Sequence, residues 1–354
     1  MTTDPPLTTY GVVGVGLMGI EHLRNLFNLP AVSIVCIADN HPGSLQSCLS
    51  IIAAESPATA EHLSVFDSAA DLFAANLCDI AIIATPNHTH HSVLMHAYEQ
   101  ANSAMHILVE KPLCTTIPHC REVILAAGKR QGITFVGLEY SYMPPVRNWN
   151  RFSANSGGTF VEKCCHFFDL FNRIMRPHTP LAVMASGGQD VNHLDEVYDG
   201  VKSDILDNGY VIIEYSGGRR ACLDLCMFAE ASRSQEEVAI TGDKGKLEAF
   251  LPQLEVRTGI RGKHACGDVE FETVDDERIK YRGHHHGSSY LEHIDILKAV
   301  RGVKTGECVD VPTSGLHHGL LSVAIGVAAQ LSIQERRFVK LEEVLSAEEL
   351  ARSV

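Results

Sequence analysis

Short apolar runs alternate with longer amphipathic segments through the first part of the chain. Runs that fit buried strands occur at residues 10–15, 32–38, 79–84, 104–109 and 133–138. The segments between them fit helices, at residues 20–29, 67–75, 90–101 and 115–131. Strands and helices that alternate in this way predict a doubly wound parallel sheet. Right-handed crossovers then bring the carboxyl ends of the strands to one edge of the sheet.

The pattern changes near residues 137–140. Further strands fit segments 210–215, 220–228, 237–241, 246–250, 254–257 and 269–274, and helices fit 289–302 and 317–333. Ser-Gly-Gly and Gly-Asp-Lys-Gly turns join the first two pairs of strands as hairpins, so the second sheet is predicted to be mainly antiparallel. We therefore expect a loose tail at residues 1–9, a Rossmann-type domain at 10–137 and a second α/β domain at 138–354.

Composition indicates a globular protein of two domains. The composition, 45% hydrophobic and 20% charged residues, is that of a globular protein. A chain of 354 residues is longer than a single hydrophobic core usually accommodates. With 43 acidic and 29 basic residues the formal charge is −14, which argues against nucleic acid or an anionic membrane surface as a partner. No apolar run reaches the ~18 residues of a membrane span, and residues 1–9 lack the features of a signal peptide.

Cysteine usage predicts a cytoplasmic protein. The chain has 11 cysteines and no secretory signal, which is typical of reduced thiols. Cys164 and Cys165 are adjacent, and Cys222 and Cys226 lack the spacing of a zinc site. We therefore expect no bound metal.

A glycine-rich turn follows the first strand. Gly14 and Gly16 allow a tight turn and a close approach of the backbone to a pyrophosphate, and Gly19 allows the next helix to pack on the strand. Leu17 and Met18 complete this phosphate loop. The helix that begins here offers free N–H groups to the phosphates, so the turn predicts a dinucleotide site.

Asp39 ends the second strand, 20 residues after Gly19. A carboxylate at this point accepts hydrogen bonds from the adenosine ribose hydroxyls and repels a 2′-phosphate. No arginine lies nearby in the sequence to offset that repulsion, so we expect NAD rather than NADP. The alternative is that Asp39 caps the helix expected after Pro42.

Two further strand ends carry polar residues. Thr85, Asn87 and His88 follow the strand at 79–84, and Glu110-Lys111-Pro112 follows the strand at 104–109. Pro112 cannot donate to the sheet and holds Lys111 in extended or turn geometry. A lysine at the carboxyl end of a buried strand lies where open α/β sheets bind ligands. The alternative is a solvated Glu–Lys pair at an ordinary strand end.

These motifs together resemble the Gfo/Idh/MocA oxidoreductases. The resemblance rests on the glycine turn, on Asp39, on Pro-Asn-x-x-His at 86–90 and on Glu-Lys-Pro at 110–112. It implies an NAD-binding Rossmann domain followed by a substrate-binding and oligomerisation domain with a large open sheet. It also implies hydride exchange between nicotinamide and a polyhydroxylated substrate, with Lys111 at the reacting centre. Glu110, Asn87 and His88 would lie near the cofactor.

A second constellation lies at residues 157–169. If the chain is helical from Glu162 onward, then Glu162, His166 and Asp169 share one helix face. A carboxylate one turn before a histidine can orient the ring as a general base, although a surface Glu–His pair is the alternative. The segment resembles the family's Gly-Gly…Asp-x-x-x-His-x-x-Asp element, whose acidic residue and histidine act on the substrate. His166 and Asp169 match it, whereas Glu162 and Lys163 depart from it.

The sequence thus predicts an NAD-dependent dehydrogenase for a secondary alcohol of a sugar or cyclitol such as an inositol. His166, oriented by Glu162, would take the hydroxyl proton, Lys111 would hold the oxygen, and Asp169 would help to bind the substrate. Two other interpretations stay open. One is a glycosidase that uses NAD transiently, and the other is a non-catalytic, cofactor-binding regulator on the same fold.

Two features bear on assembly and on the site's edge. The segment 210–215 carries apolar residues on both faces, with Val211 and Ile213 opposite Tyr210 and Ile212. An uncovered apolar face usually finds a partner, and the family resemblance points to a homodimer or homotetramer through the second sheet. The histidines at 284–286 precede a predicted helix that could bring His285, His286 or Tyr290 towards the site, but we interpret them as a solvated loop.

Overall fold

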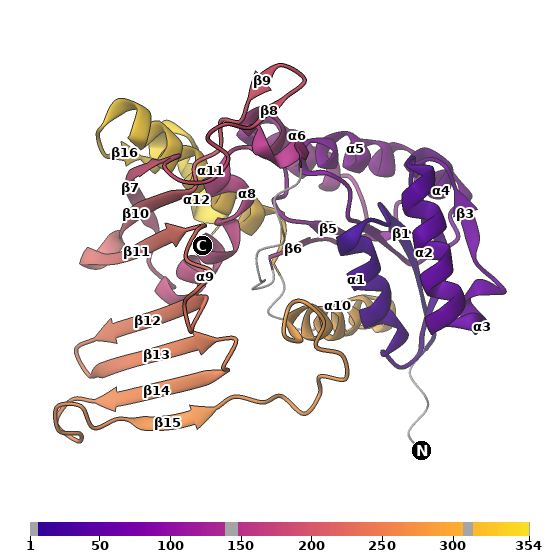
Figure 1. Cartoon of the computed structure of the whole chain (residues 1–354). Coiled ribbons are helices and arrows are strands. Elements are labelled where there is room, and N and C mark those ends of the chain that lie inside the picture. Colours follow the sequence, from indigo (N-terminus) through magenta and orange to yellow (C-terminus); the bar gives the residue numbers. More distant parts are fainter. Residues whose placement is uncertain (1–5, 139–147, 307–313, 354) are drawn as a thin grey trace.

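A six-stranded parallel sheet forms the centre of the N-terminal half (Figure 1). The computed structural model describes residues 6–138, 148–306 and 314–353. The strand order is β3-β2-β1-β4-β5-β6. The strands are β1 (Thr8–Val13), β2 (Val32–Ala38), β3 (Ser64–Phe66), β4 (Ile80–Ile83), β5 (His106–Glu110) and β6 (Thr134–Gly137). This confirms the predicted doubly wound sheet.

Side chains of the sheet alternate between two apolar layers. In β5, Leu108 joins one buried cluster while Ile107 and Val109 join the other, as the two-residue period of a strand requires. Helices α1, α2 and α10 cover the Leu108 side, and α4, α5 and α6 cover the opposite side. Their bounds are α1 (Leu17–Phe27), α2 (Pro42–Glu55), α4 (Ala69–Ala75), α5 (His90–Gln100), α6 (Ile117–Ala127) and α10 (Ser288–Thr305).

Helix α10 comes late in the sequence but packs on the N-terminal half. Ile296 and Val300 of α10 share a buried cluster with Leu23 and Leu26 of α1. Figure 1 shows α10 directly beside α1, far from the antiparallel strands that precede it in the chain. This crossing brings the segment before α10 close to the glycine turn.

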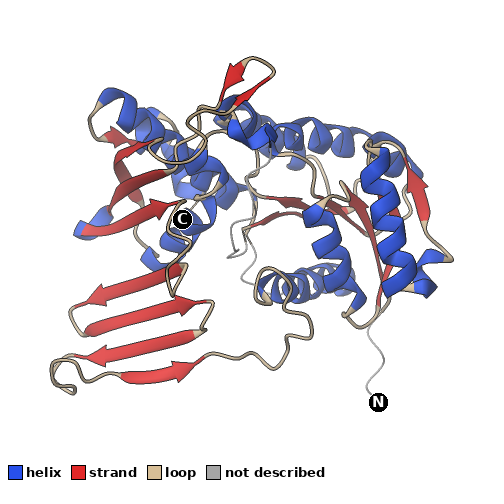
Figure 2. Ribbon diagram, in the orientation of Figure 1, coloured by secondary structure: helices blue, strands red, loops and turns tan. Residues whose placement is uncertain are grey.

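The C-terminal half contains two antiparallel sheets of four strands each (Figure 2). One has the order β11-β10-β7-β16 and the other β12-β13-β14-β15. The mainly antiparallel character is confirmed, but no pairing joins β11 to β12 among the described strands, so the single sheet is divided. The strands are β7 (Pro180–Gly188), β10 (Asn208–Tyr215), β11 (Arg219–Cys226), β12 (Glu236–Gly242), β13 (Gly245–Leu251), β14 (Glu255–Ile260), β15 (Glu270–Thr273) and β16 (Val339–Lys340).

Helix α11 (Leu316–Glu335) is the core of this half. It packs against β7 and α9 and reaches back to β6 and α6 of the parallel sheet. Among the described helices, α11 alone is long and apolar enough to span a membrane. Most of its residues are buried inside the fold, as in the core helix of a globular domain. The remaining elements include the β8–β9 hairpin (Val197–Tyr198, Val201–Lys202), α7 (Ser153–Ser156), α8 (Thr159–Glu162), α9 (Cys165–Met175) and α12 (Ala347–Arg352).

Candidate active site

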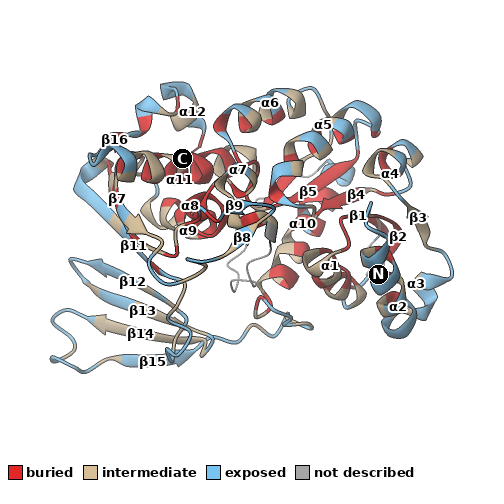
Figure 3. Ribbon diagram, turned by 45° about the horizontal axis from the view of Figure 1, so that its top comes forward, coloured by how far each residue is buried: buried red, intermediate tan, exposed pale blue. Residues whose placement is uncertain are grey.

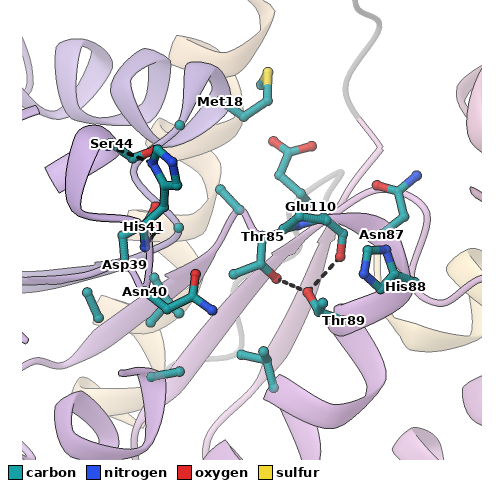
Figure 4. Close-up of a pocket in the computed structure, with 18 of the residues that line it drawn as sticks. Met18, Asp39, Asn40, His41, Ser44, Thr85, Asn87, His88, Thr89 and Glu110 are labelled. Carbon is teal, nitrogen blue, oxygen red and sulfur yellow. Dashed lines mark hydrogen bonds between the residues drawn. The ribbon is translucent and has the colours of Figure 1, made fainter. Parts of the chain in front are cut away.

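One cavity of about 690 Å³ lies along the carboxyl ends of β1, β2, β4 and β5. Its wall includes most of the predicted site residues: Gly14, Gly16, Leu17, Met18, Asp39, Thr85, Asn87, His88, Glu110, Lys111 and Glu162. Figure 4 shows Asp39 and His41 on one side of the cavity, and Glu110, Asn87 and His88 on the other. The groove predicted from the strand ends is therefore present, and residues from the C-terminal half complete it.

The glycine turn adopts the backbone that a phosphate site needs. Gly14 has φ +86°, and a Cβ there would lie 2.7 Å from the carbonyl oxygen of Ala84. A Cβ on Gly19 would clash with the carbonyl oxygen of Gly14, so Gly19 allows α1 to pack on the loop. Gly16 precedes α1 and offers no side chain as a cap. The first N–H groups of α1 therefore stay open for an anion.

Asp39 braces the loop at the adenosine end of the cavity. Its Oδ2 accepts a hydrogen bond from the Val15 N–H over 2.9 Å, and its Oδ1 accepts one from the His41 N–H over 2.8 Å. The helix cap at this point is His41, whose Nδ1 accepts from the Ser44 N–H, so the alternative role for Asp39 is not realised. Carboxylate oxygens have further lone pairs for ribose hydroxyls. The loop, helix end and carboxylate together fit a dinucleotide.

His90 connects the two polar strand ends. Its Nδ1 lies 2.8 Å from the carbonyl oxygen of Pro112, and its Nε2 lies 2.9 Å from that of Thr85. The ring is wholly buried, and burial lowers its pKa against the opposing effect of these two contacts. Because His90 contacts both loops, it fixes the Asn87–Thr89 turn (η1) relative to the Glu110-Lys111-Pro112 segment.

Lys111 lies between the two halves of the chain. Its Nζ donates a hydrogen bond to the main-chain carbonyl of Glu162 over 3.2 Å and lies 3.9 Å from Glu162 Oε1. The other carboxylate oxygen of Glu162 is 3.1 Å from Lys163 Nζ. Burial raises the pKa of Glu162, but the Lys163 and Lys111 ammonium groups and a hydrogen bond from Asn150 outweigh burial and lower the pKa. Glu162 is thus an ionised carboxylate shared by the buried Lys163 and the partly buried Lys111.

The helix predicted from Glu162 onward is interrupted, which corrects the sequence interpretation. Helix α8 ends at Glu162, a turn occupies Lys163 and Cys164, and α9 begins at Cys165. Glu162 and His166 therefore do not lie on one continuous helix face. Burial raises the pKa of Cys165 to about 12 and also raises that of Cys164 well above its usual value, so neither thiol ionises at neutral pH.

His166 and Asp169 are buried on α9 but are not part of the described cavity wall. Asp169 Oδ2 accepts hydrogen bonds from Arg173 Nε over 2.7 Å and from Ser314 Oγ over 3.0 Å. Asp169 Oδ1 has no hydrogen-bond partner among the described residues. One oxygen of Asp169 therefore holds α9 to the start of α11. The sequence predictions of their catalytic and binding roles remain predictions.

The structure adds two residues that the sequence did not indicate, and a third, His285, whose approach to the site the sequence left as an alternative. Trp149 and Asn150 lie in the short helix η2 (Asn148–Arg151), and both line the cavity. Trp149 is near His88, with the ring centroids 6.0 Å apart. His285 also lines the cavity, and its Nδ1 lies 2.6 Å from Ser289 Oγ. His285 is only 4% exposed, so the prediction of a solvated histidine loop is wrong for this residue.

Two family descriptions match almost the whole chain. Residues 8–138 match the oxidoreductase family, NAD-binding Rossmann fold, and residues 133–341 match the oxidoreductase family, C-terminal alpha/beta domain. The chain belongs to the Gfo/Idh/MocA oxidoreductase family. This establishes an NAD(P)-dependent dehydrogenase class of enzyme and confirms the resemblance seen in the motifs.

The proteins that this chain resembles are named for different reactions. A myo-inositol 2-dehydrogenase of Thermotoga maritima is 24% identical over 95% of this chain and 99% of its own length. A 2,7-anhydro-N-acetylneuraminate hydratase of Escherichia coli is 25% identical over 77% of this chain and 76% of its own. A glycosyl hydrolase family 109 protein of Shewanella pealeana is 29% identical over 34% of this chain and 26% of its own. The levoglucosan dehydrogenase structure with NADH shares the fold, with a TM-score of 0.72 and 16% identity over 94% of this chain and 99% of its own.

Proposed function

We propose that this oxidoreductase uses NAD to oxidise a secondary alcohol of a sugar or cyclitol. The observation that carries the proposal is the meeting of Lys111 and Glu162, from the two halves of the chain, at the end of the cavity remote from Asp39. Strands β1 and β4 lie between β2, which ends at Asp39, and β5, which ends at Glu110. The span suits an extended dinucleotide with its reacting ring near Lys111.

The proposed mechanism gives each residue at that end one task. Bound nicotinamide supplies the hydride acceptor. Lys111 holds the substrate oxygen and provides positive charge as an alkoxide develops. Glu162 anchors Lys111 through its main-chain carbonyl and its carboxylate. His166 takes the hydroxyl proton, and Asp169 contributes to substrate binding.

NAD is proposed over NADP on the composition of the cavity wall. Lys111 is the one lysine or arginine among its described residues. The neighbours of Asp39 are Asn40, His41 and Ser44, none of which carries a permanent positive charge. A 2′-phosphate would therefore meet the Asp39 carboxylate without a compensating cation.

A glycosidase that oxidises its sugar transiently remains the second candidate. The glycosyl hydrolase relative matches over 34% of this chain and 26% of its own length, and the same lysine and base would serve both reactions. A non-catalytic regulator is less well supported, because a sensor would need neither Lys111 nor His166. The two enzymes differ in whether NADH accumulates.

We propose that the second half of the chain also forms a homodimer or homotetramer. In β10, Val211 and Ile213 are buried, whereas Tyr210 is 57% and Ile212 is 40% exposed. Ile212 pairs with Met184 and Cys222 on the neighbouring strands, so the exposed apolar surface continues across the sheet. Figure 3 also shows β12–β15 largely exposed or intermediate. A second copy would cover these faces.

The test is a spectrophotometric screen of inositols, aldoses and their lactones, with NAD and NADP in parallel. We expect NADH formation with one of the polyols or aldoses and weaker activity with NADP. Release of an alcohol or a sugar from glycosides without net NADH would favour the glycosidase. Cofactor binding with no turnover on any substrate class would favour the regulator.

A further inference from the structure

A chain of buried side chains runs from α10 to the cavity wall. His293 Nε2 lies 3.0 Å from His22 Nδ1, and His22 Nε2 lies 2.8 Å from Glu110 Oε1. Both rings are wholly buried, and Glu110 is 5% exposed. The three residues belong to α10, α1 and β5, so the chain connects three elements through hydrogen bonds shielded from water.

Glu21, the residue before His22, holds the segment that leads into α10. Glu21 Oε1 accepts a hydrogen bond from the His284 N–H over 3.1 Å, and Glu21 is 1% exposed. Further along α10, Tyr290 donates from its hydroxyl to the Asn28 carbonyl over 3.0 Å. Because α1 holds the segment at these points, His293 has a fixed position relative to His22.

The chemistry of the atoms decides where the protons lie. A carboxylate only accepts, so His22 Nε2 carries the proton that Glu110 Oε1 accepts. If His22 is neutral, its Nδ1 accepts from His293 Nε2–H. If His22 were a cation, His293 would bear a buried proton on Nδ1, an atom with no hydrogen-bond partner among the described residues. Buried N–H groups without an acceptor are rare and costly, so the arrangement in which both rings donate toward Glu110 satisfies the hydrogen bonds of this chain best.

Glu110 keeps its negative charge although it is buried. Burial raises the pKa of this carboxyl, but the hydrogen bond from His22, the electrostatic attraction of that ring and the nearby Lys111 and His285 side chains outweigh burial, and the pKa falls below its usual value. Burial lowers the pKa of His293 well below its usual value, which keeps that ring neutral. Glu110 is therefore a negative charge in a fixed place.

The position of that charge relates it to the redox state of the cofactor. Figure 4 shows Glu110 across the cavity from Asp39, where the nicotinamide would lie. Lys111, the next residue, also lines the cavity. The nicotinamide ring is positively charged only when oxidised. A nearby carboxylate stabilises the charged form more than the neutral one.

We infer that His22 and His293 are positioning residues for Glu110: their hydrogen bonds in series hold this carboxylate at the cavity wall, where its charge favours the oxidised cofactor over the reduced one. The inference rests on the nicotinamide cofactor of the proposed function and is independent of the substrate. It is therefore tested by cofactor binding alone.

The protein provides its own probe. Trp149 is the single tryptophan of the chain and lines the cavity, so its fluorescence reports the Kd of NAD⁺ and of NADH. Glu110→Gln removes the charge and should raise the ratio of the two constants, NAD⁺ over NADH, about tenfold. His22→Leu and His293→Phe should raise the ratio in the same direction by about threefold, because Glu110 loses its support.

Conservative variants separate positioning from mere packing. Glutamine offers one donor and one acceptor, so His22→Gln and His293→Gln should keep the wild-type ratio. His106→Leu is the matched control, since His106 is also buried but lies at the opposite end of β5. It should lower the melting temperature without changing the ratio. If His22→Leu does not fold, the His293→Phe and His293→Gln pair carries the same comparison. An unchanged ratio in Glu110→Gln, or equal shifts in the Gln and apolar variants, would overturn the inference.

Discussion

Lys111 Nζ donates a hydrogen bond to the main-chain carbonyl of Glu162 over 3.2 Å, and this contact joins β5 to α8 across the cavity. A main-chain acceptor does not change its charge with pH. The contact therefore fixes the direction of the Lys111 side chain over the whole range in which the protein is folded.

Cofactor preference depends on Asp39. Asp39→Ala should narrow the difference in Kd between NAD and NADP, because it removes two ribose contacts and the repulsion of a 2′-phosphate. Asp39→Asn is the matched variant, since it removes the charge but keeps an acceptor for the Val15 N–H. Titration of Trp149 fluorescence measures both constants. A wild-type preference of tenfold or more for NADP, about 1.4 kcal/mol, would contradict the account.

The shared carboxylate of Glu162 should matter for stability. Glu162→Gln leaves the buried Lys163 ammonium, 3.1 Å away, without its counter-ion, and should cost about 3 kcal/mol of the free energy of unfolding. The double variant Glu162→Gln/Lys163→Met removes the uncompensated charge and should recover part of that loss. Urea unfolding measures both. Equal stability of the single and double variants would show that the pair is not coupled.

The ion pair between α6 and α12 should weaken in acid. Arg121 Nε and a second guanidinium nitrogen donate to the two Glu349 oxygens over 2.6 and 2.9 Å. This hydrogen bonding lowers the pKa of Glu349 from 4.5 to about 2. A carboxyl whose pKa is lower in the folded protein than in the unfolded chain stabilises the fold at pH values above its unfolded pKa. This stabilisation is lost as the pH falls through its folded pKa. Arg121→Met should therefore lower the free energy of unfolding by no more than about 1 kcal/mol above pH 5. The difference from wild type should shrink as the pH falls toward 2, which urea unfolding over this pH range measures.

Assembly should depend on the exposed face of β10. Ile212→Glu places a charge in the centre of the proposed contact, whereas Tyr215→Phe in the same strand alters only the buried side. Light scattering at micromolar concentration should give a dimer or tetramer for wild type and Tyr215→Phe, and a smaller species for Ile212→Glu. A monomeric wild type would refute the homo-oligomer.

Local patterns in the sequence predicted the sheet because each pattern acts over a few residues. The apolar runs at 32–38 and 79–84 and the glycine turn need only their own neighbours, and β2, β4 and the start of α1 occur as expected. The carboxyl ends of parallel strands share one edge, so the strand pattern alone predicts that Asp39, Thr85 and Lys111 line the same groove.

The remaining parts of the site depend on contacts far apart in the sequence. His285 is buried because its segment is held by Glu21, and the His284–Glu21 bond spans 263 residues. Glu162 contacts two lysines and does not share a helix face with His166, because the turn at residues 163–164 separates α8 from α9. No proline or glycine marks that turn, so helical periodicity continued through it.

The central claim concerns Lys111, and single-turnover hydride transfer at saturating cofactor and substrate tests it most directly. Lys111→Met should leave the Kd of NAD nearly unchanged and slow hydride transfer about a hundredfold or more, as expected when an electrostatic stabiliser of a developing oxyanion is lost. His166→Asn should behave similarly. If both residues serve one proton transfer, the double variant should lose much less than the product of the two single losses. A Lys111→Met enzyme that transfers hydride at nearly the wild-type rate would contradict the account and would reduce Glu110-Lys111-Pro112 to the end of a strand.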